Sequence, residues 1–165
     1  MVSKETTSSN GYYFEDKKEY SNFFFYLETI IMYQNIILIP YRDRQKHLDY
    51  FLQETVPLLH RNLPDSKVII VEQTPGELFN RGKLLNVGFK EFQDQTNYFI
   101  TNDVDINPKE KTIQDLYASE IEESDLIRGI YNNKHGTLGG LIKIKHDHIF
   151  QSNGCLLYTS DAADE

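Results

Sequence analysis

The chain has 165 residues, a net charge of −8 and 39% apolar residues, which fits one globular domain or part of a larger one. Its 11 Tyr and 10 Phe exclude a wholly disordered chain, and its acidity argues against general binding of nucleic acid or anionic membrane. No apolar run reaches the ~20 residues that a membrane span needs. The single Cys155 allows neither an intrachain disulfide nor a cysteine-built zinc site.

The first predicted elements follow a lead-in, residues 1–34, which is polar and then aromatic. We expect the polar part, residues 1–22, to be flexible, whereas the aromatic residues 23–26 could begin to pack onto the domain. Residues 36–39 form a continuous apolar run, typical of a strand buried on both faces. Apolar residues then recur at helical spacing over 48–59, and Asn62 and Pro64 are expected to end this helix.

The next segments repeat the same alternation. Residues 68–71 predict a second buried strand, and residues 74–76 predict a turn. Residues 80–92 predict a helix, although Gly88 disfavours it unless something packs closely there. Residues 98–100 predict a third strand. The alternation of strand and helix favours an α/β fold with a mostly parallel sheet, in which ligands bind outside the carboxyl ends of the strands.

The rest of the chain is less regular. Residues 109–123 predict an exposed acidic helix, and residues 126–131 and 138–144 predict two strands joined by 132–136. The triplet His146-Asp147-His148 resembles a metal tag, but i and i+2 side chains of a helix do not face each other. We therefore interpret it as a polar helix start capped near Asp147.

Charged side chains follow each of the three predicted strands. Arg42 and Arg44 come after the first, where they could form a fork for phosphate or carboxylate or simply begin a solvated helix. After the second strand, Phe79 could stack on a base beside Arg81; the alternative is a core residue followed by an exposed arginine.

Asp103 and Asp105 come directly after the third strand. In extended chain, i and i+2 carboxylates point to one side, and repulsion between them favours a shared cation, with Mg²⁺ or Mn²⁺ suited to oxygen ligands and substrate phosphates. A simple turn with capping remains the alternative. Positive groups, a ring and a carboxylate pair together match a nucleoside diphosphate held through a divalent ion.

Four blocks of sequence resemble the β-1,4-galactosyltransferases (glycosyltransferase family 7), in the order and spacing of that family, across residues 35–154. The blocks are Ile39-Pro40-Tyr41-Arg42-Asp43-Arg44, Phe79-Asn80-Arg81-Gly82-Lys83-Leu84-Leu85-Asn86-Val87-Gly88-Phe89, Asp103-Val104-Asp105 and Leu138-Gly139-Gly140. The second is highly specific, whereas the aspartate triplet alone is not.

The resemblance implies a GT-A, Rossmann-like fold and an inverting, Mn²⁺-dependent transfer of galactose from UDP-galactose to an acceptor sugar. It implies Asp105 as a direct metal ligand, Asp103 on the sugar or ribose side of the donor, and Gly139 and Gly140 close to the sugar. The positions that it places around the donor are Pro40, Tyr41, Arg42, Arg44, Phe79, Arg81, Asp103, Val104, Asp105, Gly139 and Gly140.

Some positions depart from the family pattern. Gly82 replaces a usual alanine, and Asn102 stands where serine is common. Thr137 lies near the family position that touches the 2-substituent of the donor sugar. A residue smaller than tyrosine there leaves room for an N-acetyl group, so N-acetylgalactosamine is an alternative donor sugar. Lys134 and Arg128 are weak candidates for a later donor-contacting lysine.

The largest departure is the family's tryptophan-rich block, which carries the catalytic base and the acceptor site. This chain has no Trp, so we expect a fold incomplete at its C-terminus, a fragment without transferase activity of its own, and no catalytic residue. Residues 155–165 are similar to translated adapter sequence and are expected to be a non-native tail.

Two further functions stay open beside the transferase fragment. One is a non-catalytic nucleotide-sugar-binding module, and the other is a metal-dependent phosphoesterase, which would want more metal ligands than the nearby sequence offers. The resemblance implies a Golgi location, although no anchor or signal is visible. It also implies a glycan acceptor, with GlcNAc and xylose both open. From the charge we expect no nucleic-acid partner, and no membrane contact is visible in the sequence of this fragment.

Overall fold

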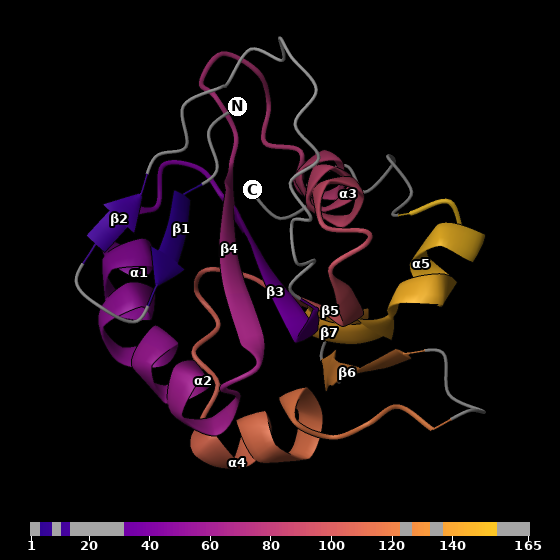
Figure 1. The fold of residues 1–165 in the computed structure, drawn as a ribbon. Helices are drawn as coiled ribbons and strands as arrows, with labels where there is room; N and C mark the ends of the chain where they lie inside the picture. The colour runs from indigo at the N-terminus through magenta and orange to yellow at the C-terminus, as the bar shows by residue number, and fades with distance from the viewer. Residues whose placement is uncertain (1–3, 8–10, 14–31, 123–126, 133–136, 155–165) are drawn as a thin grey trace, which may run out of the picture.

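The computed structural model describes residues 4–7, 11–13, 32–122, 127–132 and 137–154. Together they form one seven-stranded sheet in the order β2-β1-β4-β3-β5-β7-β6, with helices on both faces (Figure 1). No helix in these ranges is long and apolar enough to cross a membrane.

The centre of the sheet is three parallel strands, β4 (Ser66–Glu72), β3 (Tyr33–Tyr41) and β5 (Thr96–Asn102), paired in that order. All three were predicted from their apolar runs, and each extends beyond its run. Residues 36–39 of β3 have no exposed surface, as expected for a strand with helices on both faces.

The prediction of a mostly parallel sheet is wrong outside this centre. β7 (Thr137–Lys145) pairs antiparallel with β5, and β6 (Ile127–Asn132) pairs antiparallel with β7. On the other edge, β1 (Lys4–Thr7) pairs antiparallel with β4 and with β2 (Gly11–Tyr13). The sequence predicted β6 and β7 as strands but no strand in the lead-in, because β1 and β2 are short and carry no apolar run.

The first predicted helix is α1 (Gln45–Tyr50), a π-helical turn η1 (Phe51–Thr55) and α2 (Val56–Asn62) in succession. It ends at Asn62, as predicted. The π turn comes directly before Pro57, whose ring clashes with the carbonyl four residues back in a regular α-helix.

The second predicted helix is α3 (Arg81–Glu91), capped by Asn80, whose side chain accepts a hydrogen bond from the Lys83 amide at 2.8 Å. Gly88 lies against the β-sheet: a Cβ there would come within 2.8 Å of Leu38 Cδ1. The close packing that this glycine required is therefore present.

The acidic segment after β5 is shorter and less exposed than predicted. It forms α4 (Glu110–Thr112) and a second π-helical turn, η2 (Ile113–Tyr117). Ile113 and Tyr117 are fully buried, because this segment is amphipathic and packs its apolar side against the sheet. Residues 123–126 lie outside the described ranges.

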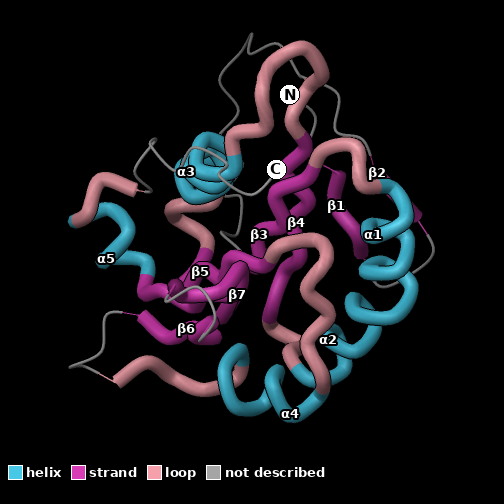
Figure 2. Tube along the Cα trace, turned by 180° about the vertical axis from the view of Figure 1, so that it is seen from behind, coloured by secondary structure: helices cyan, strands magenta, loops and turns pink. Residues whose placement is uncertain are grey.

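The helices divide between the two faces of the sheet, and each face has its own core. α1, α2 and α4 cover one face, where Ile37 and Ile39 meet Phe51 and Leu59; α3 and α5 (His146–Gln151) cover the other. The view from behind shows the same division (Figure 2). Since β4 and β5 lie on opposite sides of β3, right-handed crossovers require this arrangement.

Candidate functional site

The chain reverses its direction of winding between β3 and β5, and the predicted site residues gather at that point. β3 is the first strand of the parallel centre, β4 is added on one side of it and β5 on the other. In open α/β sheets, the crevice outside the carboxyl ends of the strands at such a reversal is the usual ligand site. The residues after β3, β4 and β5 and the beginning of antiparallel β7 all lie at this edge.

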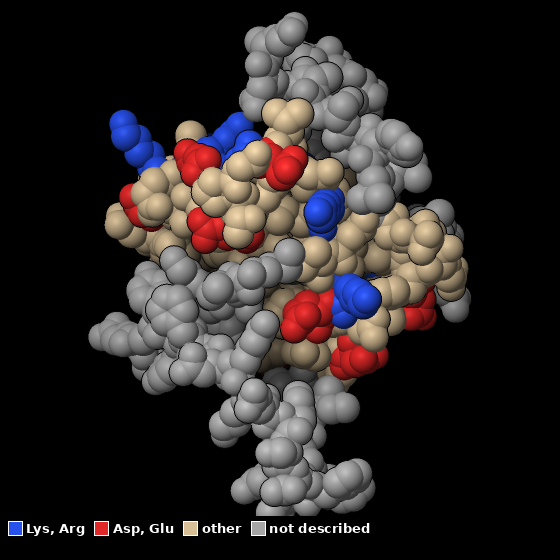
Figure 3. All heavy atoms as spheres, turned by 90° about the horizontal axis from the view of Figure 1, so that it is seen from above, with Lys and Arg blue, Asp and Glu red and all other residues tan. Residues whose placement is uncertain are grey.

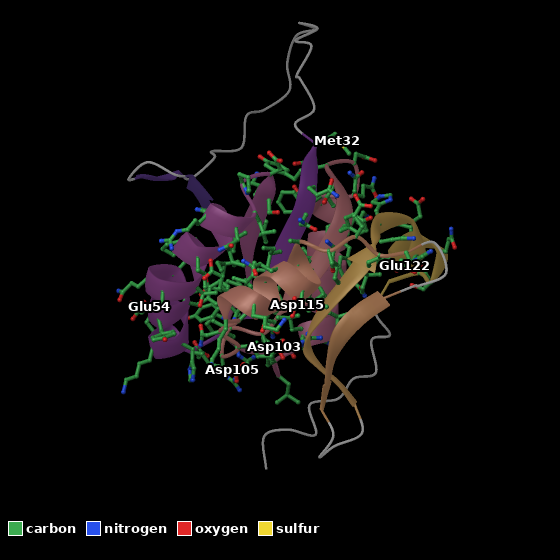
Figure 4. All side chains as sticks on the ribbon, turned by 90° about the horizontal axis from the view of Figure 1, so that it is seen from below. Met32, Glu54, Asp103, Asp105, Asp115 and Glu122 are labelled. Atoms are coloured by element: carbon green, nitrogen blue, oxygen red, sulfur yellow. The ribbon has the colours of Figure 1, made fainter. Side chains whose placement is uncertain are left out.

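The sequence suggested that Asp103 and Asp105 continue β5 in extended form, but they do not. The Ile106 amide donates to the Asp103 carbonyl at 2.9 Å, which closes a turn over residues 103–106. Figure 4 shows both aspartates near one another at the edge of the molecule. Because of the turn, each carboxylate faces a different arginine.

Asp103 is held from two sides. Its Oδ1 accepts a hydrogen bond from Arg81 Nε at 2.6 Å, and its backbone amide donates to the Gly140 carbonyl at 2.9 Å. A Cβ on Gly140 would lie 2.6 Å from Asp103 Cγ and closer still to Oδ2. Only glycine therefore lets β7 approach this carboxylate.

Arg81 is not the solvent-exposed arginine of the alternative interpretation. It is the first residue of α3, 28% exposed, with its Nη2 buried and without a hydrogen-bond partner. A guanidinium with one end fixed by a carboxylate and an unpaired N–H at the other is oriented to receive a further acceptor.

Asp105 is more open. Its carboxylate accepts a hydrogen bond from Arg44 Nη1 at 3.1 Å, with side-chain exposures of 44% and 50% for the two residues. Arg44 is also the N-cap residue of α1, although its side chain makes no cap hydrogen bond. The alternative prediction, that this arginine begins a helix, is therefore correct for its backbone position. An exposed pair of this kind contributes at most ~1 kcal/mol to stability, so it is easily exchanged for other partners.

Arg42 and Arg44 do not form a fork in this structure. Arg42 donates to the Glu77 carbonyl, and its guanidinium lies 5.4 Å from the centre of the Phe79 ring. Between the two arginines, Asp43 has a positive φ of 53°, which turns the chain. Phe79 is half-buried and packs on the core beneath α3, as the alternative of a core residue predicted. Its ring also contacts the Arg42 guanidinium.

Three of the predicted positions have side chains directed into the protein. Pro40 is buried, Tyr41 is 5% exposed and Val104 is 3% exposed, the last two within the core of the α2 face. The Tyr41 hydroxyl donates to Gln45 Oε1 at 3.2 Å, and burial, with Glu72 and Asp43 nearby, raises the pKa of Tyr41. The side chains of these residues are therefore not available to a ligand.

Two supporting side chains were missed by the sequence analysis. Gln73 spans the turn after β4: its Nε2 donates to the Leu78 carbonyl and its Oε1 accepts from the Asn80 amide, both at 2.8 Å. Asn102 lies buried at the end of β5 and donates to the Asp103 and Ile106 carbonyls at 2.7 and 3.0 Å. Neither position carries a sequence signal, because both contacts depend on the folded loops. The predicted turn itself is present, with Gly76 at a φ of +113°.

The remaining candidates lie elsewhere or outside the described ranges. The triplet His146-Asp147-His148 begins α5, as predicted, but no side chain caps this helix; His146 Nδ1 instead lies 2.8 Å from Asp147 Oδ1. Thr137 and Gly139 lie in the first part of β7. Lys134 and the 155–165 tail lie outside the described residues, as does the side chain of Arg128.

A cavity of about 500 Å³ lies at the opposite edge of the sheet, lined by Met32, Tyr98 and the first residues of α5. It contains none of the predicted site residues. On the face seen in Figure 3, the described acidic and basic side chains are interspersed, without a continuous basic surface among them.

The site residues fit a divalent metal ion in part. No group of three His, Cys, Asp or Glu side chains that could hold a metal exists among the described residues. Asp105 is the more open of the two site carboxylates, with 44% of its side chain exposed against 33% for Asp103, and its contact with an arginine is the longer one, 3.1 Å against 2.6 Å. One carboxylate fits an ion whose other ligands are substrate phosphates and water, so Asp105 fits as a partial ligand set.

Comparison with known proteins identifies the family. The model of the N-terminal region of glycosyl transferase group 7 matches residues 19–119, well over half of the chain. The chain belongs to glycosyl transferase group 7. This confirms the family resemblance, and the matched range contains the first three of the four sequence blocks.

Relatives of this group 7 chain agree in sequence and structure. It is 35% identical over 125 residues to human β-1,4-galactosyltransferase 4, covering 72% of this chain and 36% of the human protein. It superimposes on the catalytic domain of Drosophila β-1,4-galactosyltransferase 7 in complex with xylobiose, with a TM-score of 0.64, 27% identity and coverage of 76% of this chain and 54% of that one.

A mutant of the Drosophila enzyme in complex with manganese, UDP-Gal and xylobiose matches with a TM-score of 0.62 and 26% identity, over 74% of this chain and 53% of that one. The GT-A fold predicted from the resemblance is therefore confirmed. The group 7 chain spans about a third of the length of the human relative and about half of the Drosophila domain.

Proposed function

We propose that residues 35–154 form the donor-binding part of a group 7 galactosyltransferase, preceded by a lead-in over 1–34. The parent enzyme would transfer galactose, or N-acetylgalactosamine, from a UDP-sugar to an acceptor sugar in β-1,4 linkage with inversion. The observation that carries the proposal is the pairing of Arg81 with Asp103 at 2.6 Å and of Arg44 with Asp105 at 3.1 Å, at the edge where the sheet reverses.

The arginines suit the diphosphate. Arg44 makes only an exposed contact with Asp105, and Arg81 carries a buried, unpaired Nη2. Both guanidiniums can therefore donate hydrogen bonds to phosphate oxygens without losing a strong protein contact. They would offset the negative charge that grows on the departing diphosphate.

The uridine and the sugar would use the flanking groups. Phe79 presents an aromatic face to the Arg42 guanidinium, which lies 5.4 Å from the ring centre, and such a face can stack on a base. Asp103, fixed by Arg81 and the Gly140 backbone, would accept hydroxyl hydrogen bonds from the sugar or ribose. Gly139 and Gly140 would let the backbone approach the sugar, and Pro40, Tyr41 and Val104 would contribute backbone groups.

Asp105 would hold Mn²⁺ as one of several ligands, the others coming from the donor phosphates and from residues beyond those described. When bound, the ion supplies Lewis-acid stabilisation of the leaving diphosphate. The site residues of this chain bind and orient the donor. Arg44, which contacts Asp105 before the donor arrives, would move to the phosphates as Asp105 takes the ion.

A second function, a nucleotide-sugar-binding module without catalysis, is favoured for these 165 residues by one observation. Both site carboxylates in the described part accept hydrogen bonds from arginines. Neither is therefore placed as a free base that deprotonates an acceptor hydroxyl. We infer that transfer to a glycan acceptor, GlcNAc or xylose, needs residues supplied elsewhere in the parent enzyme. A Golgi location is proposed on family grounds.

The experiment is calorimetric titration of the purified chain with UDP, with and without Mn²⁺, followed by an assay with UDP-galactose, Mn²⁺ and a GlcNAc acceptor. Mn²⁺-dependent UDP binding without transfer is expected. Absence of UDP binding under both conditions refutes the donor site, and robust transfer refutes the assignment of the base to other residues.

A further inference from the structure

The turn that carries Asp103 and Asp105 is held by a buried side chain just before it. Asn102, the last residue of β5, is fully buried. Its Nδ2 donates to the Asp103 carbonyl at 2.7 Å and to the Ile106 carbonyl at 3.0 Å. These two carbonyls bracket the turn, so a single amide group ties both of its ends to the strand.

The orientation of that amide is itself fixed. Asn102 Oδ1 accepts a hydrogen bond from the hydroxyl of Tyr117, which is fully buried in η2. The amide does not flip, because a flip would turn Oδ1 toward the Asp103 and Ile106 carbonyls, which can only accept hydrogen bonds. Nδ2 therefore keeps both of its hydrogens on the turn.

Tyr117 is in turn anchored to the sheet from the other side. Lys143 of β7, 1% exposed, donates from Nζ to the carbonyls of Tyr117 at 2.6 Å and of Ser119 at 2.8 Å. Donors of positive charge near the last carbonyls of a helical segment are favourable. A continuous set of buried hydrogen bonds thus runs from β7 through η2 to the aspartate turn.

We propose that Asn102 is a positioning residue for the donor site, which sets the turn so that Asp105 is presented to the metal ion. The proposal rests on the proposed function. The turn's own backbone contributes a hydrogen bond from Ile106 to Asp103. Asp105 is exposed, and among the described residues the side chain that holds it is Arg44. Without Asn102, the direction of the Asp105 carboxylate is set by weak contacts alone.

A purely structural role for Asn102 makes a different prediction. A buried amide that only satisfies polar groups in the core would, when removed, lower stability and weaken every ligand alike. A positioning role weakens the metal-dependent part of donor binding, since groups that orient a metal ligand are worth about 10–100-fold in metal affinity. The two roles separate in the ratio of UDP affinities with and without Mn²⁺.

The variants are Asn102→Ala and Tyr117→Phe, which removes only the hydroxyl that orients the amide. The matched control is Thr101→Val, at the preceding buried position of β5, where the hydroxyl has no hydrogen-bond partner. UDP affinity is measured by calorimetry with and without Mn²⁺, and hydrogen exchange of the amides in residues 103–106 is measured by mass spectrometry.

In Asn102→Ala, we expect the gain in UDP affinity from Mn²⁺ to fall about tenfold or more, the metal-free affinity to stay unchanged, and the turn amides to exchange faster. Tyr117→Phe should change the Mn²⁺-dependent gain and the exchange of the turn amides in the same direction but by less, and Thr101→Val should change neither. If Asn102→Ala does not fold, Tyr117→Phe decides. Equal losses of UDP affinity with and without Mn²⁺ in Asn102→Ala overturn the inference, as do turn amides that exchange at the wild-type rate. If Mn²⁺ does not change the UDP affinity of the wild type, the proposed function is refuted instead. The hydrogen-exchange data then still test the role of Asn102 in the turn.

Discussion

The glycine that lies against Asp103 provides a direct perturbation of the site. In Gly140→Ala, the new methyl group would lie 2.6 Å from Asp103 Cγ and 2.9 Å from Ile106 Cδ1, whereas ordinary contact begins at 3.4 Å. Cγ alone therefore has to withdraw by about 0.8 Å, the difference between 2.6 and 3.4 Å, and Oδ2 has to withdraw further because it lies closer still to the new methyl group. Asp103 cannot do so freely, because Arg81 holds its Oδ1 at 2.6 Å.

The energetic cost follows from this displacement. Overpacking by one methyl group in a well-packed region costs about 1–3 kcal/mol, and a chain of this length loses roughly 2–4 °C of Tm for each kcal/mol. Withdrawal also weakens the charge-assisted bond to Arg81. We expect both the free energy of unfolding and the affinity for UDP-galactose to fall.

Thermal denaturation and UDP-galactose titration of Gly140→Ala are compared with Asp103→Ala and with the double variant. Because Asp103→Ala removes Cγ and both oxygens, it leaves room for the methyl group. The double variant should be no less stable than Asp103→Ala alone, although its donor affinity stays low. Strictly additive losses of stability in the double variant would show that the two residues do not meet.

Three further predictions concern charge, packing and pH. Arg81→Lys keeps the charge but loses the planar fork, so calorimetry should show UDP affinity lowered by about tenfold, the order of one charge-assisted hydrogen bond. Phe99→Ala empties a fully buried position whose ring packs edge-on at 5.0 Å from Phe89, and urea unfolding should show a loss of about 3–5 kcal/mol with UDP affinity unchanged in the folded fraction. Burial raises the pKa of Tyr117, so the stability that its protonated form contributes is complete below the phenol's ordinary pKa of ~10 and is lost at higher pH; urea unfolding across alkaline pH should show a smaller decline in Tyr117→Phe.

Phe99→Ala is also a control for Arg81→Lys, because it lowers stability without touching the donor side. Equal losses of UDP affinity in the two variants would contradict the assigned site. An identical alkaline decline of stability in the wild type and Tyr117→Phe would contradict the burial argument for that hydroxyl.

The central elements of the fold could be predicted because their signals are local. Continuous apolar runs mark β3, β4 and β5, and Asn80 as a cap followed by helical periodicity marks α3. The π turn at Phe51–Thr55 and the strands β1 and β2 left no such signal. The placement of β7 antiparallel to β5 also escaped prediction, because strand pairing depends on contacts between distant segments.

The site shows the same division. The sequence places Arg42, Arg44, Arg81, Asp103 and Asp105 at strand ends, and the structure brings them to one edge. The pairing of each aspartate with its own arginine was not predicted, because it depends on the turn after β5, which only the folded chain defines. The role of Asn102 in that turn was missed for the same reason.

The most direct test of the donor site compares UDP binding by the wild type and by Asp105→Ala, with and without Mn²⁺. Asp105 is exposed and its one ion pair is weak, so the variant should fold with unchanged stability. The wild type should bind UDP more tightly with Mn²⁺, and Asp105→Ala should bind it equally with and without the ion. A Mn²⁺-dependent gain that is the same in both proteins would contradict the assignment of Asp105 and, with it, the proposed donor site.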